Sequence, residues 1–327
     1  MNNRQTSFVA PVTVPEIPTL PSAVFEYLLV RGNNPSRPAL ENRVAFQWEQ
    51  EGDVLGYYNG SMKNRITLEW LAESVEEKVE SRTLKVEGGR GKAVLDVGCA
   101  YGNMLLMLNA RLSHPQNVRL VGIDLHPEGM QFAGTFAEYV PGYSNCMFQV
   151  ANLTNGLPFA DATFDAVNLG DVLEHMDDPN AALKELIRVM KPGAALLIST
   201  PLRESMFKRF AAFCNRLSRG RLNRAYYDGK NTQLNDDGLP IMRVHVGNDH
   251  VSEMTFPELR ALIRDCGLEI EKMEMMPIMS GGKWFDRHPF LLAALMALEA
   301  LHRTFRFPSW SHSVCLLARL PKVRSTS

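Results

Sequence analysis

The sequence predicts an α/β fold with a doubly wound, Rossmann-like and mainly parallel seven-stranded sheet. Two observations predict it. From residue 91 onward, short apolar runs alternate with amphipathic helical patterns, and this alternation is typical of a parallel sheet covered by helices. In addition, 45% of the residues are apolar and 22% are charged, as expected for a chain that forms a sizeable core.

The residues before the core predict an N-terminal extension. Four prolines within residues 1–22 favour an extended or disordered arm. Residues 23–90 are expected to form a helical extension, with a short helix at 23–30 and a longer one at 61–80. A glycine-rich linker, 88–91, then leads into the first strand.

The first half of the core should contain three strands. The run 93–97 is apolar enough for a strand covered on both faces, and helix 103–112 follows with leucines on one stripe. Strand 119–124 ends on an acid and precedes a helix that includes 132–139. Strand 147–153 closes this half.

The second half should contain four more strands and a long insertion. Strand 164–169 precedes a helix capped by Asp178, with a proline at its first position. Strand 194–200 completes the core segment 91–201. The polar segment 202–250 is too long for an ordinary connection and is expected to be an inserted lid. The remainder, 251–327, holds a helix opened by a capping box at Thr255, strands 268–275 and 313–319, and an insertion at 277–312 with an apolar helix at 290–305.

Charge and cysteine usage exclude several classes of function. The formal net charge is −1, so no overall positive field indicates a nucleic-acid partner. The five cysteines are scattered without a C-x-x-C pair, which argues against a zinc site or a disulfide framework and fits a reducing compartment. We assign no metal ligands, and we expect no secretion signal, no transmembrane span and a cytoplasmic location.

A glycine loop after the first strand is the strongest local motif. Gly98 and Gly102 allow a sharp turn and a close ligand approach, and the helix that follows offers N–H groups to a polar ligand. A dinucleotide fingerprint would place glycine at 98, 100 and 103. Ala100 and Asn103 stand at the last two positions, which disfavours a nicotinamide enzyme.

This loop and five later segments together resemble the class I S-adenosylmethionine-dependent methyltransferases that act on small molecules. The segments are 156–159, 164–165, 172–175, 183–189 and 191–193. They stand in the order and spacing seen in that family. The resemblance covers roughly residues 92–201 and, more loosely, 250–276.

The resemblance implies S-adenosylmethionine as cofactor and assigns roles to residues at the strand ends. The residues that would line its methionine end are Asp96, Gly98, Cys99, Ala100 and Gly102. Asp124 would hold the ribose, Leu125, Asn152 and Leu153 would flank the adenine, and Gly170 and Asp171 would lie near the transferred methyl group. Asn152 stands where the family often has Asp, but its carbonyl oxygen keeps an acceptor for the adenine amino group.

The acceptor side of the site is expected to come from other residues. A hydroxyl acceptor needs a base, and His175 and His250 are the candidates, although packing roles explain both histidines equally well. Tyr57 and Tyr58 could close over the cofactor. Seven basic residues in 203–224, among them Arg216, Arg219 and Arg221, face one nearby acid, Glu204. This cluster suggests an anionic acceptor, and a solvated helix face explains it equally well.

The sequence therefore predicts a methyltransferase that moves a methyl group to an O, N or C atom of a small, anionic metabolite resembling a sugar, a natural product or a lipid. The alternatives are a nicotinamide oxidoreductase and a protein that binds S-adenosylmethionine without catalysis. An RNA substrate is disfavoured by the net charge. The apolar helix 290–305 is expected to pack in the core or in a homodimer, and contact with a membrane surface stays as the alternative.

Overall fold

The structure is a computed structural model of the 327-residue chain. It describes residues 54–76, 91–205, 209, 213, 216, 217, 219, 250–276, 278, 289–305 and 310–322. The expected arm 1–22, the expected helix 23–30 and most of the expected lid 202–250 lie outside this range.

Seven strands form one sheet in the order β3-β2-β1-β4-β5-β7-β6. Their bounds are β1 Lys92–Val97, β2 Val118–Asp124, β3 Cys146–Val150, β4 Phe164–Gly170, β5 Met190–Pro201, β6 Glu269–Met275 and β7 Ser313–Arg319. β7 runs antiparallel to both of its neighbours, and the pairs from β3 to β5 are parallel. The predicted mainly parallel, seven-stranded sheet is confirmed.

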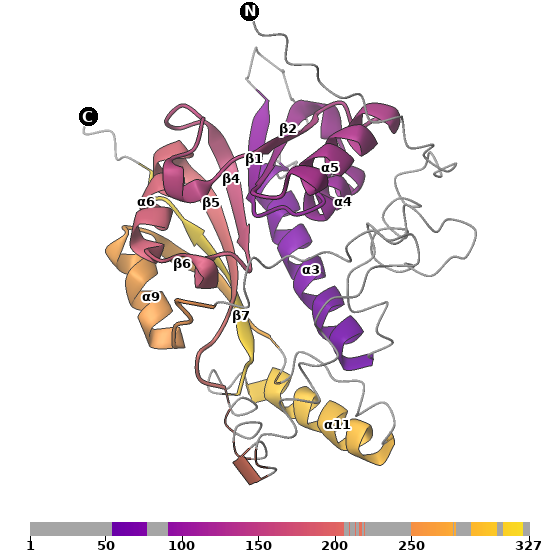
Figure 1. The fold of residues 1–327 in the computed structure, drawn as a ribbon, viewed down its shortest axis with the longest axis vertical. Coiled ribbons are helices and arrows are strands. Elements are labelled where there is room, and N and C mark those ends of the chain that lie inside the picture. The colour runs from indigo at the N-terminus through magenta and orange to yellow at the C-terminus, as the bar shows by residue number, and fades with distance from the viewer. Residues whose placement is uncertain are drawn as a thin grey trace, which may run out of the picture.

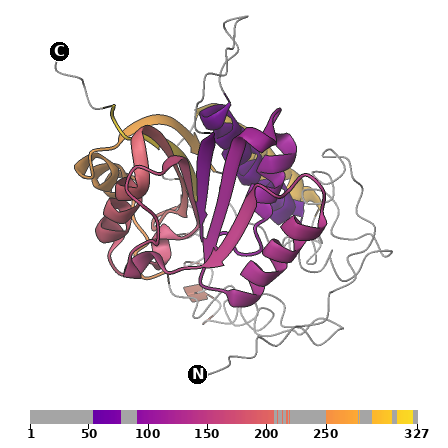
Figure 2. The ribbon, with the colours of Figure 1, turned by 90° about the horizontal axis from the view of Figure 1, so that it is seen from above.

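Helices cover both faces of this sheet (Figure 1; Figure 2). One face packs against α3 (Val54–Val75), α4 (Asn103–Arg111) and α5 (Pro127–Tyr139), and the other against α6 (Pro179–Val189) and α9 (Phe256–Asp265). The view from above in Figure 2 shows the sheet between the two helical layers. Each face buries its own aliphatic cluster, so β1 and β4 are covered on both sides, as their continuous apolar sequences predicted.

Several helix boundaries follow the predicted caps. The Asp178 carboxylate accepts the N–H groups of Asn180 and Ala181, both at 3.0 Å, and starts α6. Thr255 and Glu258 form the predicted capping box of α9. Each cap satisfies N–H groups that have no partner inside the helix.

The structure also defines boundaries that the sequence left open or placed elsewhere. α5 includes the predicted 132–139 and begins at Pro127, where the His126 ring accepts the Gly129 N–H and a proline occupies the first position. β3 ends at Val150, before the predicted 153, because Asn152 caps a 3₁₀ turn over Leu153–Asn155. α3 covers Val54–Val75 in place of 61–80.

Helix α11 (Pro289–Phe305) lies outside the two layers, beyond the edge of the sheet where β7 begins (Figure 1). It buries two polar residues: Glu299 accepts the Ile278 N–H at 2.7 Å, and His302 Nε2 lies 2.9 Å from Ser311 Oγ. Phe290, Leu301 and Phe305 are exposed. No described helix combines the length and hydropathy needed to cross a membrane.

Candidate active site

The functional residues predicted for the core gather at the carboxyl edge of the parallel strands. Asp96 on β1 pairs in register with Gly122 on β2 and Asn168 on β4, so the loops after these three strands leave the sheet side by side. This edge is where open α/β sheets bind their ligands.

The loop after β1 needs glycine at two positions. Gly98 and Gly102 have φ of 72° and 77°, values that side chains disfavour. A Cβ on Gly98 would lie 2.3 Å from Val172 Cγ2, and one on Gly102 would lie 2.5 Å from the Phe148 ring. The Ile123 carbonyl accepts the N–H groups of both Gly98 and Cys99, which fixes the start of the loop to β2.

Asp124, at the end of β2, ties two loops together. Its Oδ2 accepts the Ala100 N–H at 2.8 Å and its Oδ1 accepts the His126 N–H at 2.9 Å. Ala100 has a left-handed backbone with φ of 50°, which this bond helps to hold. Each carboxylate oxygen has a second lone pair, so the implied contact with ribose hydroxyls remains compatible with both bonds.

Asp96 places a buried carboxyl group beneath the loop. Its Oδ1 accepts a 2.7 Å hydrogen bond from Asn168 Nδ2. Burial, reinforced by the neighbouring Asp124 charge, raises the pKa of Asp96 to about 7, although the Asn168 bond opposes the shift. The loop therefore lies over a carboxyl group that a nearby cation would ionise.

Three residues expected near the cofactor have side chains that contact other parts of the protein. Asn152 Oδ1 accepts two bonds from Thr154, at 2.9 Å from its N–H and 2.7 Å from its hydroxyl, so the implied acceptor for adenine is already used. The side chains of Leu153 and Cys99 are buried in the core, with Cys99 Sγ directed at Met130 Sδ. Leu125, by contrast, is 62% exposed, as expected for a side chain that covers a ligand.

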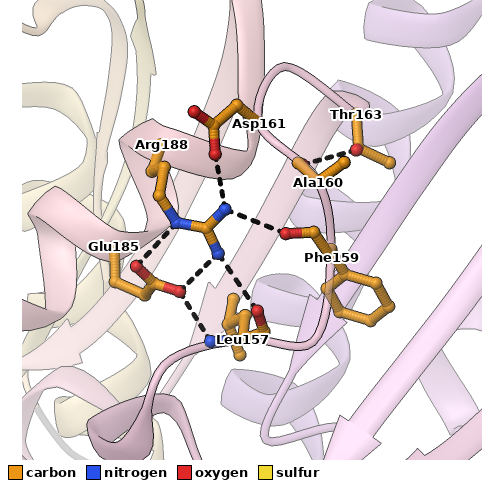
Figure 3. A network of polar contacts seen from close by, with 7 residues as sticks. All are labelled: Leu157, Phe159, Ala160, Asp161, Thr163, Glu185 and Arg188. Carbon is orange, nitrogen blue, oxygen red and sulfur yellow. Dashed lines mark hydrogen bonds and ion pairs between the residues drawn. The ribbon is translucent and has the colours of Figure 1, made fainter.

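The chain that follows the 3₁₀ turn is attached to α6 by one arginine (Figure 3). Arg188 donates to the carbonyls of Leu157 and Phe159, and it also binds the Glu185 and Asp161 carboxylates. Glu185 in turn accepts the Leu157 N–H at 2.6 Å. This network fixes the segment 156–163, between the 3₁₀ turn at Leu153–Asn155 and the start of β4.

Gly170 ends β4, and Asp171 connects it to the turn that carries His175. Asp171 has φ of 53°, and its Oδ1 accepts a 3.2 Å bond from Ser199 on β5. Its Oδ2 forms an ion pair with Lys63 of α3. Lys63 and Ser199 lower the pKa of the Asp171 carboxyl against the effect of burial. No local pattern in the sequence indicated a role for Lys63, because its partner Asp171 lies far away in the chain.

The two candidate bases lie next to each other, although they are far apart in sequence. The rings of His175 and His250 are 4.9 Å apart between centroids. Beside them, Glu174 is buried and its Oε2 accepts the Thr200 hydroxyl at 2.9 Å. Burial, together with the Asp171 charge, raises the pKa of Glu174 to about 7.

Three hydrogen bonds from Ser252 dock the His250 segment on the turn that carries His175. The Ser252 N–H donates to the Glu174 carbonyl at 3.0 Å, and the Ser252 hydroxyl donates to the carbonyls of Leu173 and Met176. His250 Nδ1 lies 2.7 Å from Glu253 Oε1. Ser252 and Glu253 are components of the site that no motif in the sequence singled out, and Glu174 lay within the 172–175 motif without an assigned role.

The predicted acceptor residues are only partly described. Tyr57 and Tyr58 lie in the first turns of α3, where the structure describes the backbone alone. Arg216 and Arg219 are exposed, and Arg221 lies outside the described residues. An acid from outside the segment also contacts the basic cluster, because Arg203 pairs with Glu258 while Arg209 pairs with Glu204, both at 2.7 Å.

Comparison with known proteins assigns the domain. A family model described as a methyltransferase domain matches residues 95–198, the segment that carries the glycine loop, Asp124 and the 170–175 turn. The chain contains a class I methyltransferase domain. The methyltransferase domain ends within β5, so α9, α11 and the last two strands of the sheet lie outside the matched segment.

Curated relatives share the domain at moderate identity. O-methyltransferase rstn1 of Aspergillus nomiae is 30% identical over 145 residues, 44% of this chain and 60% of that protein. The ubiquinone/menaquinone biosynthesis C-methyltransferase UbiE of Geobacter sulfurreducens is 35% identical over 130 residues, 39% of this chain and 48% of that protein. The chain thus spans about half of the length of the curated relatives it matches.

The strand order separates this domain from the nicotinamide-binding fold. A dinucleotide-binding sheet has the order 3-2-1-4-5-6. Here β7 is inserted between β5 and β6 and runs antiparallel to both. Together with Ala100 and Asn103 in the loop, this order disfavours the oxidoreductase alternative.

Proposed function

We propose that the protein transfers a methyl group from S-adenosylmethionine to an oxygen atom of a small molecule. The observation that carries the proposal is the glycine loop over Asp96 and beside Asp124, within a domain that the methyltransferase model matches. Two O-methyltransferases among the relatives, rstn1 and a ubiquinone biosynthesis O-methyltransferase of Psychrobacter cryohalolentis, support an oxygen acceptor.

The residues present fit this cofactor. Its methionine end carries an ammonium and a sulfonium, and the buried Asp96 carboxyl supplies a compensating negative charge beneath the loop. Val172 and Phe148 occupy the space that a Cβ at Gly98 and Gly102 would need. Glycine at these two positions therefore lets the loop backbone pass close to both side chains. Asp124 would accept the ribose hydroxyls, and Leu125 would cover the adenine.

Asn152 would have a different role from the one the resemblance implies. Its carbonyl oxygen binds Thr154, which leaves the Nδ2 group as a donor. We therefore assign Asn152 to holding the turn after β3 and to donating to a ring nitrogen of adenine.

When bound, S-adenosylmethionine supplies a methyl group on a good leaving group, so the protein's main contribution is positioning. An acceptor hydroxyl must also lose its proton. We assign this step to the cluster of Glu174, His175 and His250. Glu174 and His175 lie in the turn that follows β4, and the segment at 250–254 brings His250 beside them. The cluster is close to the loop because Val172, one turn earlier, packs on Gly98.

Product analysis tests the proposal directly. The full chain would be incubated with S-adenosylmethionine labelled in its methyl group and with panels of phenols, carboxylic acids and amines. We expect a labelled ether or ester and one equivalent of S-adenosylhomocysteine. Label on nitrogen or carbon would contradict the oxygen acceptor, and cofactor binding without transfer to any acceptor would favour the non-catalytic alternative.

Variants of the cluster separate chemistry from cofactor binding. His250→Ala and His175→Ala should lower kcat by about 10²- to 10⁴-fold, with the cofactor Kd near wild type. His114→Ala, on an exposed turn, is the matched control and should leave kcat unchanged. Full activity in both cluster variants would show that another group, or none, removes the proton.

Three further proposals concern the charge of the acceptor, the pairing of two copies of the chain and its cellular location. An anionic acceptor is supported by the exposed Arg216 and Arg219. Pairing of two copies through the exposed apolar residues of α11 is supported by Phe290, Leu301 and Phe305, with a membrane surface as the alternative partner. The cytoplasmic location stays a prediction.

A further inference from the structure

We propose that Glu174, His175 and His250 form a binding site for one divalent transition-metal ion, with Zn²⁺ as the cation that best suits the donors. One ligand atom from each residue lies within 4.8 Å of the others. The sequence pointed to no metal because the ligands come from two segments with the long insertion between them.

The donor set selects the class of metal. Two imidazole nitrogens and one carboxylate oxygen are the ligands of a common type of catalytic zinc site, in which the fourth position stays open. Imidazole ligands favour zinc and other late first-row ions over Mg²⁺ and Ca²⁺, which prefer oxygen. Ligand atoms at about 2.0–2.2 Å from a tetrahedral ion lie about 3.3–3.6 Å from one another. Side-chain rotations that move each ligand atom by about 1 Å would bring the present separations into this range.

Two further contacts orient the ligands as metal sites require. Glu253 Oε1 lies 2.7 Å from His250 Nδ1, and a carboxylate on one ring nitrogen sets the tautomer in which the other nitrogen binds metal. The Thr200 hydroxyl donates to Glu174 Oε2 at 2.9 Å, which directs the other carboxylate oxygen toward the histidines. Such supporting groups are a feature of metal sites and are not needed for histidines that only pack.

The backbone holds the two ligand segments in one fixed relation. Ser252 bonds to three carbonyls of the turn 173–176, two of them through its hydroxyl. His250 is therefore held over Glu174 and His175 by contacts that do not involve the ligands' own side chains. A site built in this way binds a cation without a large rearrangement.

The surroundings leave one side of the site accessible. Glu174 is buried, His175 is half-buried and His250 is exposed, so a cation can enter from the His250 side and keep an open position there. Of the carboxylates beside the site, Glu253 contacts His250 Nδ1 and Asp171 pairs with Lys63 and Ser199. The fourth position thus falls to water or to a substrate atom.

A bound cation would give the site a second way to activate the acceptor. An oxygen atom coordinated at the open position loses its proton more readily, because the cation stabilises the oxyanion. This role rests on the proposed methyl transfer, whereas cation binding itself does not.

Metal titration of the full chain tests the site. The protein would be treated with a chelator, dialysed and titrated with Co²⁺, whose visible absorption reports tetrahedral ligands, and then with Zn²⁺ in competition. We expect one ion per chain, displaced by Zn²⁺ and not by Mg²⁺. His250→Ala and His175→Ala should weaken binding at least tenfold, and the exposed control His114→Ala should bind as wild type does.

A milder variant guards against loss of the fold. Glu253→Gln keeps the size of the side chain and should weaken Co²⁺ binding about 10-fold to 100-fold, with an unchanged melting temperature for the metal-free protein. No binding by the wild type, unchanged binding by His250→Ala, or a thiolate absorption band that indicates cysteine ligands would overturn the proposal. Because the titration uses no cofactor, its failure is distinct from a failure of methyl transfer.

Discussion

Asp124 shows how one side chain organises the loop and the ligand contact together. Its two carboxylate oxygens hold the left-handed Ala100 and the start of α5. A ligand hydroxyl placed on the same carboxylate would therefore meet an acceptor whose position is already fixed by the protein.

We expect Asp124→Ala to weaken binding of S-adenosylhomocysteine by about 1.5–3 kcal/mol, because a charged acceptor for two hydroxyls is lost. Calorimetric titration measures this change. Asp178→Ala is the control: it removes the α6 cap and about 1 kcal/mol of stability, and it should leave the affinity unchanged. Equal affinities for Asp124→Ala and wild type would place the ribose elsewhere.

Asp96 predicts a pH dependence with a defined sign. Its pKa is about 7 in the folded protein, against an ordinary value of 3.8, so between these values the folded state binds the proton and the unfolded state does not. The contribution of Asp96 to the free energy of unfolding must then fall as pH rises from about 4 to about 7, and stay level above that range.

Asp96→Asn cannot ionise and should lack this loss. Its stability relative to wild type should rise by up to about 4 kcal/mol over the same pH range. Denaturant unfolding of both ligand-free proteins at a series of pH values measures the difference between their free energies of unfolding. Glu174 titrates in both proteins, so its contribution cancels in that difference. A difference that does not change with pH would mean that Asp96 titrates normally.

At the scale of elements, Arg188 links α6 to the chain that enters β4 (Figure 3). We expect Arg188→Met to lower the free energy of unfolding by about 2 kcal/mol, since two carbonyls and two carboxylates lose a charged donor. Arg264→Met removes an exposed pair with the adjacent Asp265 and should change stability by less than about 0.5 kcal/mol. Equal effects of the two substitutions on urea unfolding would show that the network contributes little.

The insertion carries the prediction on the acceptor's charge. Replacing Arg216, Arg219 and Arg221 by Gln should raise the acceptor KM at least about tenfold, about 1.4 kcal/mol, and raised salt should reproduce part of the effect. Arg203→Gln and Arg209→Gln are controls, because these side chains already pair with Glu258 and Glu204. A triple variant with wild-type KM and no salt dependence would favour a neutral acceptor.

Local patterns in the sequence predicted the elements well and the tertiary contacts poorly. The cap at Asp178, the capping box at Thr255 and the buried strands depend on neighbours in the chain, so a sequence pattern encodes them. The pairing of His175 with His250 and of Asp171 with Lys63 depends on how loops meet at the sheet edge. Asn152 is an intermediate case: its residue type suggested a ligand contact, but its own turn uses the carbonyl oxygen.

At the scale of the whole molecule, the sheet order explains why the site is divided. The strands from β3 to β5 bring the glycine loop, Asp124 and Asp171 to one edge. The segment at 250–254 and helix α3 add His250 and Lys63 to that edge from outside the matched domain. Under the proposed function, the cofactor side would be formed by the matched domain, and the acceptor side would draw on residues outside it.

The most direct test of the account is a thermal-shift measurement of the purified chain with S-adenosylhomocysteine and, separately, with NAD. At about 100 times its Kd, S-adenosylhomocysteine should stabilise the protein by about 2.7 kcal/mol, which raises the melting temperature by several degrees, while NAD leaves it unchanged. A rise with NAD and none with S-adenosylhomocysteine would contradict the methyltransferase assignment.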